Sequence, residues 1–597
     1  MAERRLHPAA AGQARAPRRV DAALLLALLL ALPAVLPLTA PGYFFNAHDA
    51  HHSVFWLVEF DQTLRAGSLW PIWAPDHALG FGYPLWLIYA PLPFIVAEAF
   101  HLAGLGFTAA VKATWALGFF LGALGIYRVA QRWWGSSAAL VASLVFTYAP
   151  YHLAQIYVRA DLAEFMAWSW FPWAFLAVDL LWDDPRPRRL ACAALALGAL
   201  LYLHTVSPLI FAPFLAAYFL YRLVRERRLQ PAALRPALWV TGAAALGVLL
   251  AVAFLVPGVV EQRFLSRTEW LNPNYDYWLH FVYPNQFLSP FWGFGASLPG
   301  PDSGMSFQLG ALAVLGGAAG CLAGLAASKT RLPHRREVLF LAVATLVAIF
   351  LMTGYSAPLW SLVPLVGTLM QFPWRLLALT MVTLALLSGA AVYWLDAAGG
   401  RPPGSAVSAW ACLAGLAVVL ASFSYTRPQL QPIRPDDESP LAVIEFETTY
   451  PDMRGMTAWA QHPPLDADSP LLREYLAGLP LQRAAVLAGS GQVVAQGTAP
   501  ASAWARITAG TAVRLRFYTY YFPGWSATVD GRPAAITPDP PNGLIGLSVP
   551  AGQHMVQVRF GPTPIRNIAG AISLVALAAV ALLLLIPSFG RSRTGML

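Results

Sequence analysis

The sequence predicts a polytopic α-helical membrane protein with a β-sandwich-like domain near its C-terminal end. Of the 597 residues 57% are hydrophobic and only 12% are charged, against roughly 25% charged in an ordinary soluble domain. Apolar runs of about 20 residues, long enough to cross a bilayer, recur along the chain. A late stretch in which apolar and polar residues alternate predicts the β-domain. A water-soluble enzyme is not expected.

The net charge of +9 does not indicate a nucleic-acid-binding protein. Of the 39 basic residues 37 are Arg, and they fall in short clusters between the apolar runs. Clusters of this kind mark the cytoplasmic loops of a membrane protein rather than a surface that binds nucleic-acid phosphates. The expected partner is therefore the lipid bilayer, and no nucleic acid is expected.

The first element is a basic segment, residues 1–20, which is followed by an uncharged stretch from Ala22 to Ala40. We interpret this stretch as the first transmembrane helix, because it is longer than the roughly 7 to 15 apolar residues of a signal peptide. The alternative is a cleaved signal peptide with a weak cleavage site at Leu38-Thr39-Ala40.

Further transmembrane segments bring the predicted number to about twelve, with both termini in the cytoplasm. They are expected at about 110–128, 137–156, 162–182, 190–205, 207–222, 237–257, 305–327, 338–354, 374–395, 406–424 and 567–588. The segments assigned to the cytoplasm carry 22 Lys and Arg residues, whereas the short outer loops carry only Arg159, Arg263 and Arg267, with Arg65 in the longer first loop. This asymmetry agrees with the positive-inside rule.

The stretch 190–222 has two interpretations, because Pro208 divides it into pieces that are each short for a span. A single helix would invert the later topology and place four arginines after Tyr221 outside. We therefore expect two short helices that meet near His204, and a further helix break at Pro257. Interrupted helices leave backbone groups that lipid does not satisfy but a protein-lined cavity does.

These segments define the domain organisation. It comprises a cytoplasmic N-terminus (1–20), a transmembrane domain (21–424) with external loops at 42–109 and 257–304, an extracytoplasmic β-rich domain (425–565), a last transmembrane helix (566–588) and a cytoplasmic tail (589–597). Residues 425–565 contain eleven acidic and ten basic residues, a balance typical of a water-exposed domain.

The strands of this domain are predicted near its end. Apolar and polar residues alternate from His554 to Phe560, which is the period of a half-buried strand. Residues 526–529 and 533–536 flank Asp530-Gly531, a dipeptide that favours a type I′ hairpin turn. Residues 435–480 are expected to form irregular loop with short helices.

The first external loop, 42–109, is dense in aromatic residues, which suit the membrane–water interface. From Asp49 to Ala66 the pattern predicts a helix, with Gly67 as its stop signal. Residues 84–104 are apolar but broken by Pro, and we expect an interfacial helix there. A span at this point would shift the later topology and place the Arg clusters outside.

Several segments resemble those of a known group of proteins. They are EFDQTLRAGSLWPIWAPD, GFGYPL, YHLAQIYVRADLAEF, QFPWRLLALT and, near the end, YYFPGW, SATVDG and VPAG. They resemble segments of uncharacterised bacterial multi-pass proteins labelled "6-pyruvoyl-tetrahydropterin synthase-related membrane protein", which are similar to the YfhO-like proteins, and the resemblance covers nearly the whole chain. The pterin label is not carried over, because no three-histidine metal site in a soluble α/β domain is visible.

A first helix followed by an Asp-bearing outward loop also resembles the GT-C superfamily of membrane glycosyltransferases. The resemblance implies an enzyme of the bacterial inner membrane. Such an enzyme moves a sugar from a polyprenyl-phosphate-linked donor to a glycan, lipid or protein acceptor of the envelope at the outer face. In these enzymes an Asp or Glu of the first external loop acts as general base or helps to hold a metal, and the matching position here is Asp49.

A carboxylate suits this role, because the acceptor hydroxyl must lose its proton as it attacks the anomeric carbon, and a positioned base contributes roughly 10² to 10⁴-fold. Two other interpretations of Asp49 remain open: it caps the following helix, or it is a plain exposed charge. Glu59 and Asp76 are alternative candidates for the base.

The leaving phosphate needs cations, and Arg375 and Arg159 are the candidates. Arg375 could instead snorkel to the interface, and Arg159 could pair with Asp161 or Glu164. His204, at the predicted helix break, is a candidate donor to phosphate or acceptor, with a hydrogen-bonded structural histidine as the alternative.

The cluster of His48, His51 and His52 around Asp49 could hold a divalent metal ion, the one cofactor that the sequence suggests, although the spacing matches no metal signature. Two other functions remain open. One is a transporter or flippase of lipid-linked saccharide, which the helix breaks would serve. The other is a non-catalytic envelope scaffold whose β-domain binds glycan.

Overall fold

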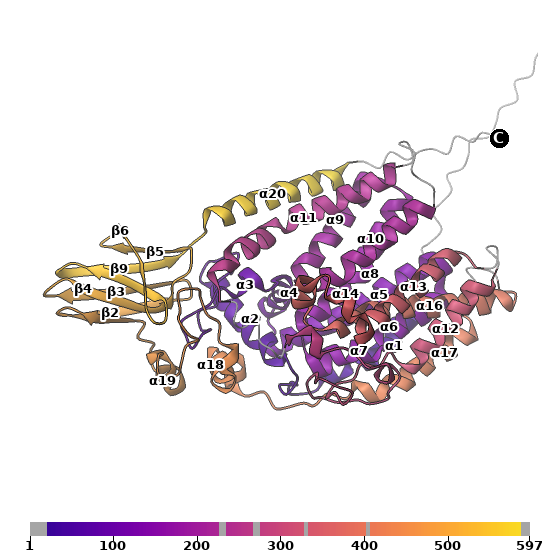
Figure 1. The fold of residues 1–597 in the computed structure, drawn as a ribbon, viewed down its shortest axis with the longest axis horizontal. Coiled ribbons are helices and arrows are strands. Elements are labelled where there is room, and N and C mark those ends of the chain that lie inside the picture. Colours follow the sequence, from indigo (N-terminus) through magenta and orange to yellow (C-terminus); the bar gives the residue numbers. More distant parts are fainter. Residues whose placement is uncertain (1–20, 226–233, 267–274, 328–331, 402–405, 587–597) are drawn as a thin grey trace, which may run out of the picture.

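The computed structural model describes residues 21–225, 234–266, 275–327, 332–401 and 406–586. It consists of a bundle of long helices with a β-domain at one end (Figure 1). The predicted basic segment 1–20, the tail 589–597 and part of the 257–304 loop lie outside the described residues.

Each of the twelve predicted transmembrane segments overlaps a helix, and the segment 137–156 extends beyond its helix across a bend. These helices are α1 (Ala22–Val35), α5 (Phe107–Trp134), α6 (Ser136–Thr147), α8 (Leu162–Asp183), α9 (Pro187–Leu203), α10 (Ser207–Arg225), α11 (Arg235–Glu261), α12 (Ala311–Ala326), α13 (Arg335–Met352), α16 (Leu377–Ala398), α17 (Ala409–Ser422) and α20 (Pro564–Leu585).

Eight helical segments of the described residues are long and apolar enough to cross a membrane, and ten are if each of two bent pairs forms one span. One bent pair is α6 with the segment 150–159, and the other is α13 with the segment 354–360. At 17 and 16 residues, α9 and α12 are shorter than these spans. The polytopic helical fold is therefore confirmed, while the number twelve and the side of the termini stay predictions.

The two predicted helix breaks have different outcomes. His204 follows the end of α9 and α10 begins at Ser207, so the break near His204 is confirmed. The predicted break at Pro257 is wrong, because α11 continues through Pro257 to Glu261. A proline removes one backbone donor but does not end a helix whose neighbours support it. Here α11 is packed so closely that a Cβ on Gly258 would lie 2.9 Å from the carbonyl oxygen of Leu87.

The first external loop contains the predicted short helices. They are α2 (Ala50–Arg65), α3 (Leu85–Ile88) and α4 (Leu92–Leu102). The helix from Asp49 and the Pro-broken segment after residue 84 are thus confirmed as helical elements. Together they lie between the bundle and the β-domain (Figure 1).

The β-domain consists of two antiparallel sheets. Its strands are β1 (Ala484–Ala488), β2 (Gly491–Ala499), β3 (Ser502–Ala509), β4 (Val513–Tyr520), β5 (Trp525–Val529), β6 (Arg532–Ala534), β7 (Thr537–Asp539), β8 (Leu544–Val549) and β9 (Gly552–Phe560). One sheet has the order β1-β4-β8-β7 and the other β2-β3-β9-β5-β6. Asp530 and Gly531 join β5 to β6 with φ angles of 49° and 79°, so the predicted type I′ turn is confirmed.

Two short helices precede the sheets, α18 (Pro440–Thr449) and α19 (Pro470–Ala477), as predicted for residues 435–480. The first loop is packed against this region. Tyr520 donates its backbone N–H to the carbonyl oxygen of Phe81 at 2.8 Å, and the ring of Trp73 lies 5.3 Å from that of Trp525. The loop and the β-domain therefore share one end of the bundle.

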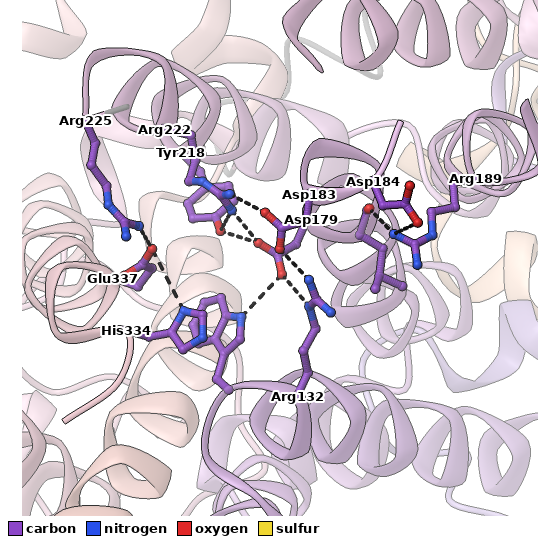
Figure 2. A network of polar contacts seen from close by, with 12 residues as sticks. Arg132, Asp179, Asp183, Asp184, Arg189, Tyr218, Arg222, Arg225, His334 and Glu337 are labelled. Atoms are coloured by element: carbon purple, nitrogen blue, oxygen red, sulfur yellow. Dashed lines mark hydrogen bonds and ion pairs between the residues drawn. The ribbon is translucent and has the colours of Figure 1, made fainter. Parts of the chain in front are cut away.

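A network of ion pairs joins the helix ends farther from the β-domain (Figure 2). Asp179 of α8 accepts hydrogen bonds from Arg132 of α5 at 3.0 Å, from Arg222 of α10 at 2.8 Å and from Tyr218 at 2.5 Å. Asp183, one turn later, accepts from Arg222 at 2.5 Å and also pairs with Arg132. Several arginines that the sequence assigns to cytoplasmic loops are thus bound to acidic residues of neighbouring helices.

Candidate functional site

The candidate site is built on an irregular turn that follows α7 (Pro150–Ala154). Residues Gln155–Arg159 form a π-helical turn, and Ala160 ends it in the left-handed conformation with φ 56° and ψ 31°. Both features are uncommon and gather at functional sites. The turn directs Arg159 toward the first external loop.

Asp49 is joined to this turn through the backbone. Its N–H donates to the carbonyl oxygen of Arg159 at 2.7 Å, and the N–H of His48 donates to that of Val158 at 3.1 Å. Asp49 occupies the position before α2, but its side chain accepts no capping hydrogen bond there. Instead its Oδ2 atom lies 4.0 Å from Nη2 of Arg159, and 38% of the side chain is exposed. The geometry thus favours the interaction with Arg159 over helix capping.

Glu164, in the first turn of α8, is the centre of the cluster. Arg159 donates from Nη1 to Oε2 of Glu164, Gln155 donates to the same oxygen at 3.0 Å, and Nε of Arg375 lies 2.8 Å from Oε1. The Glu164 side chain is fully buried. A buried carboxylate that binds two guanidinium groups holds both in fixed positions.

The guanidinium groups are also fixed by aromatic rings and carbonyl groups. Arg159 lies over the ring of Trp374 at 4.8 Å from its centroid, and Arg375 lies 5.1 Å from the centroid of Phe372. Nη1 of Arg375 donates to the carbonyl oxygen of Met370 at 2.7 Å. Such cation–π contacts stabilise a desolvated guanidinium.

A third carboxylate, Asp161, also lies close to Arg159. Its Oδ2 atom is 4.0 Å from Nη2 of Arg159, and its Oδ1 atom accepts the backbone N–H of Glu164 at 2.9 Å and the hydroxyl of Tyr89 at 3.4 Å. Asp161 therefore caps α8. Nη2 of Arg159 is 4.0 Å from a carboxylate oxygen of both Asp49 and Asp161, which is beyond hydrogen-bond distance.

Electrostatics distinguish Asp49 from an ordinary aspartate. Desolvation by the surrounding protein raises the pKa of its carboxyl although 38% of the side chain is exposed, while the charges of Arg159 and His48 act in the opposite direction. A raised pKa moves a carboxylate toward the range in which it serves as a general base.

His204 lies at the break between α9 and α10 and is buried. Its Nδ1 atom is 2.8 Å from the hydroxyl oxygen of Ser207, which also accepts a hydrogen bond from Trp168. The carboxylates of Asp161 and Glu164 lie close enough to interact electrostatically with this imidazole. His204 is thus close to the cluster and has the hydrogen-bond partner of a structural histidine.

The three histidines of the predicted metal site point to different partners. His48 places Nε2 3.0 Å from the carbonyl oxygen of Gly295, His51 packs against the ring of Phe45, and Nδ1 of His52 is 3.9 Å from Asp49. Burial lowers the pKa of His52 to about 3, so its imidazole is neutral. In the part of the chain that the structure describes, no group of three or more His, Cys, Asp or Glu side chains is arranged to hold a metal ion.

The alternative base candidates, Glu59 and Asp76, form a second cluster with each other. Oε2 of Glu59 accepts the backbone N–H of Asp76 at 3.1 Å, and Asp76 binds the hydroxyl of Tyr475 and lies 3.6 Å from Nη2 of Arg483. Burial and the charge of Asp76 raise the pKa of Glu59 well above its usual value. This cluster connects the first loop to the segment before the β-domain.

Several members of the site were not nominated from the sequence. Glu164 appeared only as a pairing alternative for Arg159, and Gln155, Tyr89 and Trp374 not at all. The segment YHLAQIYVRADLAEF contains Gln155 and Glu164, and its three charged residues next to an apolar run were the available signal.

A comparison with protein families identifies the family of this chain. A family model described as "6-pyruvoyl-tetrahydropterin synthase related domain; membrane protein" matches residues 87–427, more than half of the chain. This match confirms the resemblance drawn from the sequence segments. No curated protein matches the chain.

The solved structures that are similar at low identity include AftD and ArnT. Arabinofuranosyltransferase AftD from Mycobacteria is 17% identical with a TM-score of 0.43, over 68% of this chain and 26% of that one. ArnT from Cupriavidus metallidurans bound to undecaprenyl phosphate is 15% identical with a TM-score of 0.29, over 72% of this chain and 88% of that one. The chain thus spans about a quarter of the length of the AftD chain it matches.

Proposed function

Since the chain belongs to the family of 6-pyruvoyl-tetrahydropterin synthase related membrane proteins and brings Asp49, Arg159 and Arg375 into one cluster, we propose that it is a membrane glycosyltransferase. It moves a sugar from a polyprenyl-phosphate-linked donor to a glycan, lipid or protein acceptor of the cell envelope, at the outer face of the membrane. The convergence of one accessible carboxylate and two held guanidinium groups carries this proposal.

Asp49 acts as the general base. Its side chain is 38% exposed, whereas the carboxylates of Glu164 and Asp161 are buried, so Asp49 is the most accessible acid of the cluster. Its carboxylate takes the proton of the acceptor hydroxyl as the hydroxyl oxygen attacks the anomeric carbon. The raised pKa strengthens it as a base relative to an ordinary aspartate.

Arg159 and Arg375 bind the leaving phosphate. As the bond between the anomeric carbon and the phosphate oxygen breaks, the electron pair stays with that oxygen, and negative charge grows on the lipid phosphate. Nη2 of Arg159 lies 4.0 Å from both Asp49 and Asp161. Neither carboxylate therefore accepts a hydrogen bond from this nitrogen. Fixed positive charge at the leaving oxygen stabilises the transition state, because it needs no rearrangement during the reaction.

Glu164 positions both arginines. It contacts Nη1 of Arg159 and Nε of Arg375, so it sets their orientation and offsets part of their charge. Without this carboxylate, two buried guanidinium groups would repel each other.

Turnover of a radiolabelled polyprenyl-phosphate sugar by the purified full-length protein tests the proposal. We expect transfer to be lost in Asp49→Asn, which keeps the shape of the side chain, and to be retained in Asp436→Asn, a change of an exposed acid outside the cluster. Full transfer by Asp49→Asn would remove the base assignment. Movement of the lipid-linked sugar across vesicles without bond cleavage would indicate a transporter, and glycan binding with neither would indicate a scaffold.

A further inference from the structure

A large groove separates the helical bundle from the β-domain. It encloses about 1270 Å³. One wall is formed by α4, α9, α11 and α20, and the other by the outer face of the sheet at β3 and β9. Asp49, Arg159, Glu164 and Arg375 are not among the described residues that line it, so the groove is distinct from the proposed reaction site.

The helical wall is apolar and belongs to membrane segments. Leu195 of α9 and Leu574 and Leu577 of α20 line the groove and are exposed, and α20 is long and apolar enough to span a membrane. Gly570 of α20 also lines the groove, and a Cβ added there would meet no atom within 4 Å. This wall is therefore open to the acyl chains of a lipid that enters from the bilayer.

The opposite wall presents a polar platform with one aromatic ring. Trp504 of β3 faces Gln557 of β9, and Ser502 faces Arg559, so these four side chains lie on the same face of the sheet. A Cβ on Gly497 of the neighbouring strand would lie 2.5 Å from Nε1 of Trp504. The indole thus packs directly against this glycine, and Trp504 also lines the groove.

The rim of the groove is hydrophobic. Leu69, in the turn after α2, is 89% exposed, and the ring of Trp70 next to it contacts Tyr202 of α9 edge-on at 5.9 Å between centroids. Exposed Leu and Trp beside a membrane helix suit the level of the lipid headgroups. The groove therefore runs from the expected level of the bilayer surface to Trp504 and its three polar neighbours on the sheet.

Of the two arginines that line the groove, Arg559 is exposed on the sheet, whereas Arg566 is bound within the protein. Arg566, at the start of α20, has its Nε atom 2.8 Å from Oε2 of Glu261, and its Nη2 atom donates to the carbonyl oxygen of Pro523 at 3.0 Å. This arginine is already neutralised and buried. A flat indole beside an amide, a hydroxyl and a guanidinium is the combination that stacks on a sugar ring and bonds its hydroxyls.

We propose that this groove binds a membrane glycolipid. The acyl chains lie against α9, α11 and α20, and the sugar stacks on Trp504 with hydrogen bonds to Gln557 and Arg559. The site holds a lipid-anchored saccharide at the interface between the bundle and the β-domain.

The test uses the full-length protein in phosphatidylcholine nanodiscs, with monoglucosyl diacylglycerol as the probe and native mass spectrometry as the readout. We expect Gly570→Phe to reduce binding at least tenfold, because its ring fills the groove from a position with open space. Gly570→Ala is the matched control and keeps binding. Trp504→Ala reduces binding at least tenfold, whereas Trp504→Phe, which retains an aromatic face, loses less than threefold.

Two further probes decide the class of ligand. Phosphatidylglycerol, which has a charged headgroup without a sugar ring, is expected to bind at least tenfold more weakly, and methyl glucoside, which lacks chains, not measurably. Equal binding of phosphatidylglycerol would overturn the glycolipid assignment in favour of an anionic lipid, and binding of methyl glucoside in favour of a soluble glycan. Unchanged binding in Gly570→Phe would show that the groove is not the site. Asp49→Asn is expected to leave glycolipid binding unchanged, so this proposal and the proposed transferase activity fail separately.

Discussion

The network at the far end of α8 offers a matched pair of substitutions, Asp179→Asn and Asp183→Asn. Both carboxylates contact the same two arginines, Arg132 and Arg222. They differ in burial, since the Asp179 side chain is 3% exposed and that of Asp183 is 37% exposed. The comparison therefore measures how much burial, together with the hydrogen bonds of the buried carboxylate, adds to the energy of one kind of ion pair.

The structure gives the expected size of each effect. Loss of one partner of a buried ion pair costs roughly 3 to 5 kcal/mol, because the other charge stays buried without compensation. Asp179 also accepts from Tyr218 at 2.5 Å and from Trp133 at 3.3 Å, and an asparagine amide satisfies only part of this set. An exposed pair contributes roughly 0.2 to 1 kcal/mol. We expect Asp179→Asn to lower the free energy of unfolding by about 3 kcal/mol or more, and Asp183→Asn by at most about 1 kcal/mol.

The free energy of unfolding can be measured by titrating the protein from neutral micelles into SDS while helicity is followed by circular dichroism. Equal losses in the two variants, or a larger loss in Asp183→Asn, would refute the reasoning that burial decides the value of these contacts.

Four other outcomes follow from the site and from the cluster of Glu59 and Asp76. Glu164→Gln should abolish transfer and lower the temperature of unfolding in a thermal scan, and transfer at the normal rate by this variant would contradict the positioning role. Arg375→Lys should not support the binding of a polyprenyl phosphate, because an ammonium lacks the paired donors of a guanidinium. The pKa of Asp49 is raised, and the base must be ionised to act. We therefore expect kcat/KM to fall as the pH falls through a value above the ordinary aspartate pKa of about 3.9. An acid limb of the pH profile at or below that value would contradict this expectation. Asp76→Asn should loosen the contact with Tyr475 and speed limited proteolysis before the β-domain while the pH profile stays unchanged; a shifted acid limb would instead make Asp76 the base.

Much of the fold could be predicted because the sequence encodes it locally. Apolar runs define the helices, and Asp530-Gly531 defines its hairpin through the positive φ angles that both residues adopt. Pro208 correctly indicated a break, but Pro257 did not, because the effect of a proline inside a helix depends on the neighbouring helices. Packing of this kind is not visible in a linear pattern.

The sequence predicted several charged residues of the site but not how they are arranged. Asp49, Arg159 and Arg375 were recognised as charges beside membrane segments, and the structure links the two arginines through Glu164 and Asp49 to Arg159. The link depends on the π-helical turn at Gln155–Arg159, which no local propensity predicts. From the sequence, Asp76 was an alternative to Asp49 as the general base. In the structure it contacts Tyr475, 399 residues later, and a contact between residues so far apart cannot be predicted from one sequence.

The most direct test of the account is the side of the membrane on which the Asp49 loop and the β-domain lie. Leu69→Cys in the loop and Val494→Cys in the β-domain both replace exposed residues, and each can be introduced after the three native cysteines are changed to serine. We expect a membrane-impermeant maleimide to label both positions in intact spheroplasts. Labelling of either position only in inverted vesicles would contradict a transferase that acts at the outer face.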